Sequence, residues 1–252
     1  MSQALSVCTR KGLFRFQRTG GRWQQTYVAF LGQPVTAFLA DARTGNWFAA
    51  LSLGHFGAKL HRSTDQGATW EELTMPALPK SDDKDAPSLN QIWALEAGGA
   101  DQPGLVWVGS LPAALFRNDR NGEGDWQLVQ GLWNLPDRTK WFGGGTDETA
   151  LHSVCVDPRN SSRIVIAVSC GGVWRSEDAG DTWACQSKGV RHCTLTISVA
   201  WVIATTRNAP CAKPPIRRNQ RLLLRTQATK SNPARPILDK PLESAHFQGI
   251  TG

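Results

Sequence analysis

The sequence has few of the features that mark a membrane, metal or disulfide-rich protein. It contains one tyrosine and two methionines, and none of its six cysteines forms a Cys-x-x-Cys pair. Isolated cysteines without a histidine-rich partner segment predict neither a metal site nor a disulfide framework, and no other cofactor is indicated. The first twenty residues hold no long apolar run, so they predict neither a secretory signal nor a membrane-spanning helix. We therefore expect a cytoplasmic protein with no membrane partner.

Basic charge is concentrated at one end of the sequence. Of the formal net charge of +7, residues 190–252 carry ten Lys or Arg against two acidic residues, net +8, which leaves residues 1–189 with 18 basic and 19 acidic side chains, net −1. Glycine is also scarce after residue 189, where two of the 24 glycines lie. We expect a repeat region, 1–189, followed by an atypical basic tail, 190–252.

Three interpretations of the tail remain open: a disrupted or truncated C-terminus translated out of frame, a disordered extension, and an arm that contacts nucleic acid. Nucleic acid is the least favoured partner, because the tail offers only Trp201, between its cysteines, as a stacking platform. Residues 195–206, LTISVAWVIATT, are the one β-rich run of the tail.

Four similar segments recur along the repeat region, and each is followed eight or nine residues later by a tryptophan. The segments begin at residues 12, 59, 114 and 172 with the sequences GLFR, KLHR, ALFR and GVWR, and the tryptophans are Trp23, Trp70, Trp126 and Trp183. A period in the high forties to high fifties corresponds to one four-stranded blade of a propeller with its loops.

Two of the four copies share a specific turn motif. Residues 63–70 read STDQGATW and residues 176–183 read SEDAGDTW, and both fit Ser-x-Asp-x-Gly-x-Thr-Trp. The aspartate accepts backbone N–H groups across the turn, the glycine takes a positive φ and the tryptophan closes the hairpin. The structural residues of the motif are Ser63, Asp65, Gly67, Trp70, Ser176, Asp178, Gly180 and Trp183. The first and third copies, RTGGRW and NDRNGEGDW, keep only the tryptophan.

The pattern predicts an all-β fold, a β-propeller of four-stranded blades with about four blades and an incomplete ring. The expected strands are 4–9, 12–16 and 23–28; 35–40, 47–53, 58–63 and 70–74; 91–96, 105–110, 114–118 and 126–129; and 151–157, 163–169, 172–176 and 183–187. The first blade lacks its innermost strand, and residues 195–206 are the candidate to supply it. An unclosed ring would expose strand edges and favour self-association.

With these motifs the chain resembles the Asp-box (BNR) repeat β-propellers, which include sialidases, xyloglucan-cleaving glycosidases, sortilin-type receptors and bacterial proteins with WD40/YVTN/BNR-like repeats. The resemblance covers residues 1–189 and ends at about residue 190. It implies that the Asp-boxes stabilise hairpins on the blade periphery and are not active sites. Sialidase chemistry needs a tyrosine nucleophile, whereas Tyr27 lies on an expected outermost strand, and no Phe-Arg-Ile-Pro motif is present. The sequence therefore argues against a sialidase.

Two ends of the expected inner strands carry polar residues. At one end Asp41, Glu96 and Asp157 occupy equivalent places, and turn formation is a stronger explanation for them than catalysis. At the other end Thr36, Gln91 and His152 match, with Trp93 two residues further along its strand. Loops that enter the inner strands meet at one mouth of the channel, so these four residues are candidate ligand contacts.

The loop before His152 adds further candidates, and the preceding one is acidic at Asp82, Asp83 and Asp85. We expect Arg138 and Trp141 as additional ligand contacts and Asp147 and Glu148 as weak catalytic candidates, although the same side chains could simply fill the channel. The predicted function is binding of a carbohydrate or protein ligand at this mouth. The alternatives are a carboxylate-based glycoside hydrolase and nucleic-acid contact through the tail, and whether the protein is an enzyme stays open.

Overall fold

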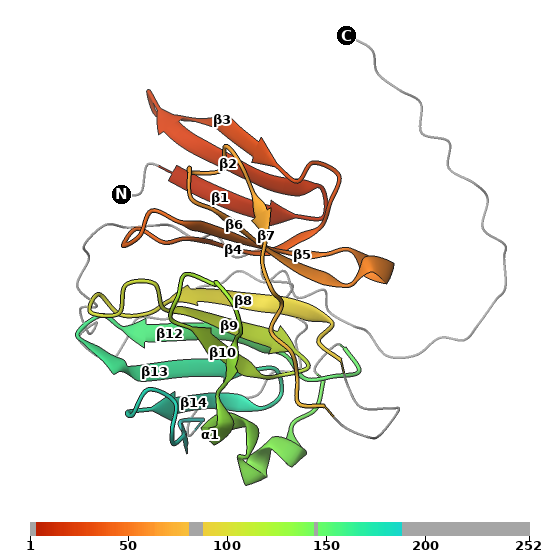
Figure 1. Ribbon diagram of the computed structural model, residues 1–252, viewed down its shortest axis with the longest axis vertical. Helices are drawn as coiled ribbons and strands as arrows, with labels where there is room; N and C mark the ends of the chain where they lie inside the picture. The colour runs from red at the N-terminus through yellow and green to blue at the C-terminus, as the bar shows by residue number, and fades with distance from the viewer. Residues whose placement is uncertain (1–3, 81–87, 144–145, 188–252) are drawn as a thin grey trace, which may run out of the picture. The chain divides into compact units, whose positions relative to one another are not determined.

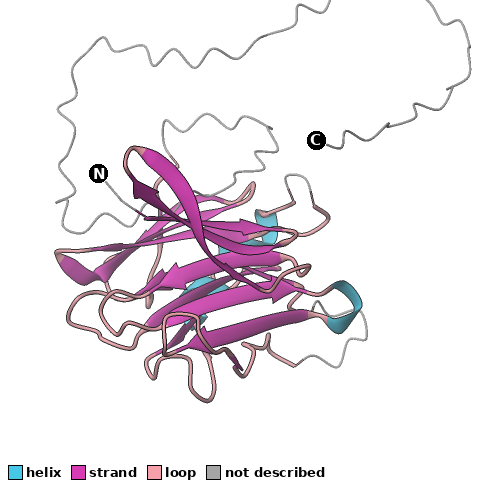
Figure 2. Cartoon of the chain, turned by 90° about the horizontal axis from the view of Figure 1, so that it is seen from above, coloured by secondary structure: helices cyan, strands magenta, loops and turns pink. Residues whose placement is uncertain are grey.

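The computed structural model describes residues 4–80, 88–143 and 146–187, which belong to one unit of the fold. Nearly all regular structure in them is β, with three short helical turns in the loops, as Figure 2 shows. The expected tail 190–252, its strand 195–206 and the acidic residues at 82–85 lie outside the described residues. No helix in the described part is long and apolar enough to cross a membrane.

The strands form four antiparallel sheets that follow one another along the chain (Figure 1). Blade 1 consists of β1 (Ala4–Thr9), β2 (Gly12–Thr19) and β3 (Arg22–Ala29). Blade 2 consists of β4 (Val35–Ala40), β5 (Trp47–Ser52), β6 (Ala58–Ser63) and β7 (Glu71–Glu72). Blade 3 consists of β8 (Gln91–Ala97), β9 (Val106–Leu111), β10 (Leu115–Asn118) and β11 (Gln127–Leu128). Blade 4 consists of β12 (Leu151–Asp157), β13 (Asn160–Val168), β14 (Gly172–Ser176) and β15 (Ala184–Cys185). The chain is therefore an all-β protein with consecutive blades of a β-propeller.

The expected strands agree closely with those observed, and the differences are informative. β1, β4, β6, β12 and β14 have the expected bounds, and blade 1 has three strands among the described residues, as predicted. The outermost strands β7, β11 and β15 are two residues long and begin after the closing tryptophan of each blade, whose indole packs against a core cluster. The short helices η1 (Gly54–Phe56), α1 (Gln130–Trp133) and η2 (Pro136–Lys140) were not predicted.

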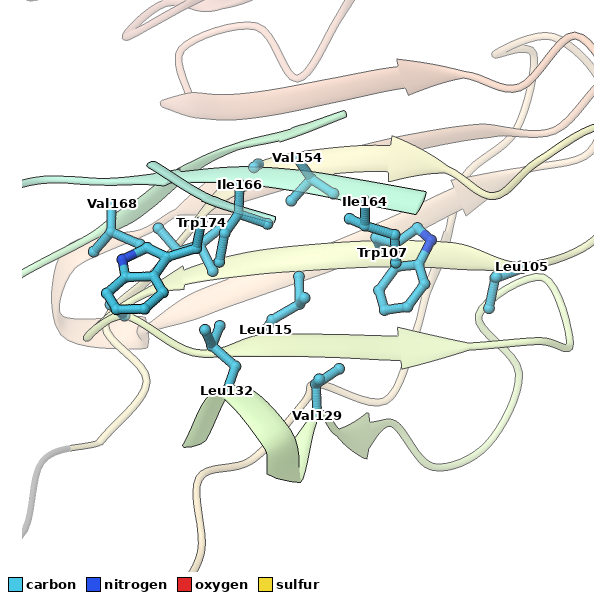
Figure 3. Packing of buried hydrophobic residues seen from close by; sticks show 13 residues of the cluster. Leu105, Trp107, Leu115, Val129, Leu132, Val154, Ile164, Ile166, Val168 and Trp174 are labelled. Carbon is cyan, nitrogen blue, oxygen red and sulfur yellow. The ribbon is translucent and has the colours of Figure 1, made fainter. Parts of the chain in front are cut away.

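Each blade has two apolar faces because successive side chains of a strand point to opposite sides of the sheet. We call the side facing the preceding blade the front face and the side facing the following blade the back face. Between blades 3 and 4, Trp107 and Leu115 of the back face pack with Ile164 and Ile166 of the front face, all at most 1% exposed (Figure 3). Such burial contributes about 1.5–3 kcal/mol for each large side chain, so the blade contacts are the main stabilising element.

The same back-to-front pairing occurs between the other blades. Phe48 and Leu60 on the back of blade 2 pack with Val108 and Phe116 on the front of blade 3. Leu13 of blade 1 packs with the front of blade 2 in a cluster of its own. Among the described residues the chain thus forms three blade contacts of one type.

The motif turns 63–70 and 176–183 have nearly identical geometry. In the first, Ser63 Oγ accepts the Gly67 N–H at 2.7 Å, and Asp65 accepts the Thr69 N–H at 2.9 Å and its hydroxyl at 2.6 Å. The hydrogen bonds from Thr69 lower the pKa of Asp65 to about 2. Gly67 has φ of 96°, in the left-handed region that favours glycine. These bonds hold the hairpin between β6 and β7.

Blade 3 forms an equivalent turn without the motif. Asn118 stands where blades 2 and 4 have serine, and its Oδ1 accepts the N–H groups of Arg120 at 2.9 Å and Gly122 at 2.8 Å. Its Nδ2 donates to the carbonyls of Glu123 and Asp125. The Asn118 oxygen therefore takes over the two bonds that serine accepts in blades 2 and 4, and its Nδ2 adds two donated bonds across the turn.

The single tyrosine links blade 1 to the motif turn of blade 2. The Tyr27 hydroxyl donates to the Gly67 carbonyl at 2.8 Å and accepts the Trp70 indole N–H at 2.9 Å. Burial raises its pKa. Tyr27 lies on β3, the outermost strand of its blade, so its surroundings are those of a structural residue.

Candidate functional site

The first strands of blades 2, 3 and 4 contact one another in order, β4 with β8 and β8 with β12. The polar side chains at one end of these strands make many hydrogen bonds and ion pairs within the protein, whereas those at the other end make few. Asp41 follows the last residue of β4, in a turn closed by its own carboxylate, which accepts the Arg43 N–H at 2.9 Å. The Asp41 side chain is 1% exposed, so its charge needs a partner.

Arg43 supplies that partner and also joins two blades. Its Nε and Nη2 donate to the two carboxylate oxygens of Asp41 at 2.9 and 2.7 Å. Its remaining N–H groups donate to the carbonyls of Gly99, Gln102 and Leu105 in blade 3, each at 2.8 Å. All five guanidinium donors are therefore used. Burial alone would raise the pKa of Asp41, but the bonds from Arg43 outweigh it and hold that pKa below its usual value.

Asp157 at the end of β12 has a similar environment. Arg159 donates to both carboxylate oxygens at 2.9 and 2.8 Å, and Arg163 adds a contact at 3.1 Å. The hydrogen bonds from Arg159 are the largest cause of a strongly lowered pKa. Asp41 and Asp157 thus form turns whose carboxylates are bonded internally, which leaves little capacity for a ligand.

Glu96, at the equivalent place near the end of β8, lacks an arginine partner within hydrogen-bond distance among the described residues. Its carboxylate accepts only the N–H of the adjacent Ala97, at 3.3 Å. Burial raises its pKa to about 7, and Asp41 adds to this while Arg43 opposes it. The thiol pKa of Cys155 on β12 is raised by burial and further by Glu96.

The opposite end of the inner strands opens into a groove of about 960 Å³. Thr36, Gln91 and Trp93, expected as ligand contacts, all line it. The structure adds residues that the sequence interpretation missed, notably Arg10, Gln33 and Phe56. In an antiparallel blade the β1–β2 turn and the β5–β6 loop reach the same end as the start of the next inner strand, which is the signal that could have identified them.

The polar groups of the groove are mostly without internal partners. Thr36 is an exception, because its hydroxyl donates to the Ile92 carbonyl at 2.7 Å and joins β4 to β8. The side chains of Arg10, Gln33 and Gln91 make no hydrogen bond or ion pair with another described residue. Phe56 is 76% exposed. Of the groove-lining residues in the described part of the chain, Arg10 alone is charged.

The other expected contacts are not among the groove residues. Arg138 stacks on Trp133 at 3.6 Å from the ring centroid and donates to the Ala113 carbonyl at 3.3 Å. Trp141 packs on Trp174 with 5.8 Å between ring centroids and covers the core between blades 3 and 4, whereas Trp133 packs on the cluster between blades 2 and 3.

His152 lies on β12, and its Nδ1 is 3.0 Å from the Ser153 hydroxyl. Burial lowers its pKa, which favours the neutral imidazole.

The two weak catalytic candidates lie in the segment before β12. Glu148 accepts a hydrogen bond from the side-chain amide of Asn90 at 2.7 Å, and Asp147 is exposed. Among the described residues no cluster of His, Cys, Asp and Glu is arranged to hold a metal ion. The roles of Asp147 and Glu148 stay predictions.

Comparison with known proteins finds similar solved structures but no sequence relative. No family model and no curated protein matches the sequence. Among solved structures, a GH74 xyloglucanase from Xanthomonas campestris is 16% identical with a TM-score of 0.48, over 72% of this chain and 27% of that chain. YCF48 from Cyanidioschyzon merolae is 15% identical with a TM-score of 0.44, over 71% and 51%. A Trypanosoma rangeli sialidase is 10% identical with a TM-score of 0.30, over 68% and 33%. All three are β-propellers, and the chain spans from about a quarter to half of their lengths.

Proposed function

We propose that the chain is an Asp-box propeller that binds a carbohydrate or protein ligand in the groove lined by Gln91 and Trp93. The observation that carries this proposal is the contrast between the two ends of the inner strands. Asp41, Arg43 and Asp157 are saturated by internal bonds at one end, whereas the groove presents polar side chains without internal partners at the other. Unpaired donors beside exposed rings are what a ligand site requires.

The groove favours a ligand that combines an apolar face with hydrogen-bonding or anionic groups. Trp93 and Phe56 offer aromatic surface, and Gln33 and Gln91 offer amides that both donate and accept. Arg10 supplies one positive charge, and no Asp or Glu is among the described residues that line the groove.

The test is a parallel screen of an immobilised glycan array and a random peptide library with the full chain. We expect a specific ligand whose dissociation constant rises ten- to a hundredfold on Trp93→Ala and on Arg10→Ala, since a central aromatic or arginine contact contributes about 1.4–2.7 kcal/mol. Phe142→Ala is the matched control, because Phe142 is 62% exposed and lies outside the groove lining. Binding that survives both groove substitutions, or no binding in either library, contradicts the proposal.

Carboxylate-based glycoside hydrolysis is the second candidate, and Glu96 is the observation that favours it. A carboxyl with a pKa of about 7 keeps the proton that a general acid must donate. On this proposal, a screen of aryl glycosides finds a substrate that the wild-type chain hydrolyses. At least one of the variants Glu96→Gln, Asp147→Asn and Glu148→Gln should no longer hydrolyse it. If the chain hydrolyses none of the substrates, this candidate is rejected and the binding proposal is unaffected.

A further inference from the structure

The back face of blade 4 carries apolar residues at the positions that blades 2 and 3 bury against the blade that follows them. The strand registers make Phe48, Trp107 and Val165 equivalent, because each pairs with the arginine of its repeat segment. Phe48 and Trp107 are 0% exposed, whereas Val165 is only partly buried. Leu60, Leu115 and Val173 form a second equivalent row with the same difference.

The front face of blade 1 shows the complementary pattern. Val7 pairs with Phe14, as Val108 pairs with Phe116 and Ile166 pairs with Trp174 in blades 3 and 4. The pairs in blades 3 and 4 are at most 4% exposed. Val7 and Phe14 remain partly exposed, and Leu5, Phe16 and Val28 extend the same apolar face.

The closing tryptophans of blades 2, 3 and 4 pack against the preceding blade, and the tryptophan of blade 1 lacks such a contact among the described residues. Trp70, Trp126 and Trp183 each pack into the cluster between their own blade and the preceding one. Trp70 also donates to Tyr27 of blade 1, and Trp126 donates to the Thr74 carbonyl of blade 2. Trp23, the equivalent residue of blade 1, is 47% exposed.

We propose that the back face of blade 4 in one copy packs against the front face of blade 1 in a second copy, head to tail. The occupant is a second copy because this back-to-front contact is already formed three times within the chain. Residues 190–252 contain one tryptophan and no copy of the Ser-x-Asp-x-Gly-x-Thr-Trp motif. Two copies with two such contacts close a ring of eight blades, within the range that propellers adopt.

The charges around the back face of blade 4 are compatible with this contact. Arg175 and Arg163 are paired with Glu177 at 2.9 and 2.8 Å, and Arg163 also contacts Asp157 at 3.1 Å. The apolar row of Val165 and Val173 therefore lies beside arginines that already have partners. This surface is separate from the groove, so the proposal does not depend on the ligand-binding function.

The test measures the mass of the full chain by light scattering and sedimentation over a range of concentrations. We expect a species of twice 27.5 kDa, and expect Val165→Asp and Phe14→Lys each to weaken dimerisation at least a hundredfold. An equimolar mixture of the two variants should dimerise again, because one of its two contacts is wild type and the other joins opposite charges. Leu31→Asp is the control, since Leu31 is 75% exposed and lies on neither face.

A monomer at every concentration, an open polymer, or a dimer that persists in a folded single variant would each overturn the proposal. A mixture that stays monomeric would overturn the head-to-tail arrangement. Circular dichroism establishes that each variant is folded. The milder pair Ala167→Asp and Phe16→Lys, placed on the same two faces, repeats the mixing experiment if either first variant unfolds.

Discussion

Arg43→Ala is expected to lower the free energy of unfolding by about 3–5 kcal/mol, as for other buried ion pairs that lose one partner. The variant leaves the 1%-exposed carboxylate of Asp41 without its counter-charge and removes the donors to three carbonyls of blade 3. Urea unfolding at pH 7, followed by tryptophan fluorescence, measures the loss. The control is Arg117→Ala, because Arg117 donates a single 3.2 Å bond to Gln127, and it should cost less than about 1 kcal/mol.

Two further variants separate charge from geometry at this position. Arg43→Lys keeps the charge but cannot reach both carboxylate oxygens and three carbonyls, so an intermediate loss is expected. The wild-type pair stabilises the fold above the unfolded pKa of aspartate and loses this contribution as the pH falls through the lower folded pKa. In Arg43→Ala burial acts on Asp41 without the opposing arginine, so that dependence should be lost or reversed, with stability then falling as the pH rises through the unfolded pKa of aspartate. Equal stability of Arg43→Ala and wild type at pH 7 would show that the pair adds nothing.

The bounds of several strands could be predicted from local sequence, because each repeat contains the residues that start and end them. Apolar strands bounded by glycine, proline and aspartate give β4, β6, β12 and β14 their bounds. The lengths of the outer strands were overestimated, because the sequence does not show where the side chains of their first tryptophans pack. Trp126 reaches the Thr74 carbonyl of another blade, and such a partner is absent from local pattern.

The site was predictable where it depends on equivalence between repeats. Thr36, Gln91 and Trp93 were identified by position on matching strands, and they do meet at the groove. Arg138 and Trp141 were chosen because they lie in the loop before His152, and in the structure they pack on Trp133 and Trp174. Tertiary contacts between side chains distant in sequence decided these cases, and a single sequence does not reveal them.

The same limitation applies to Glu96, which the sequence grouped with Asp41 and Asp157 as a turn residue. Only the structure shows that its two counterparts have arginine partners within hydrogen-bond distance and that Glu96 is buried with a weak bond to Ala97. Residues at equivalent positions of the repeats therefore have the same location in the blade but different pKa values. The difference makes the stability of the fold depend on pH near neutrality.

Glu96→Gln is expected to stabilise the protein by about 3 kcal/mol at pH 8 and to have little effect near pH 4. The folded pKa of about 7 exceeds the ordinary value of 4.5, so the unfolded chain loses this proton first as the pH rises. The wild type therefore loses stability between about pH 4.5 and 7, at about 1.4 kcal/mol for each unit of pKa difference, and the neutral amide does not. Urea unfolding of both proteins from pH 4 to pH 8 measures the difference, with Glu148→Gln at the opposite mouth as the control. A constant difference across this range would mean that Glu96 ionises normally in the fold, and that its burial does not hold the proton.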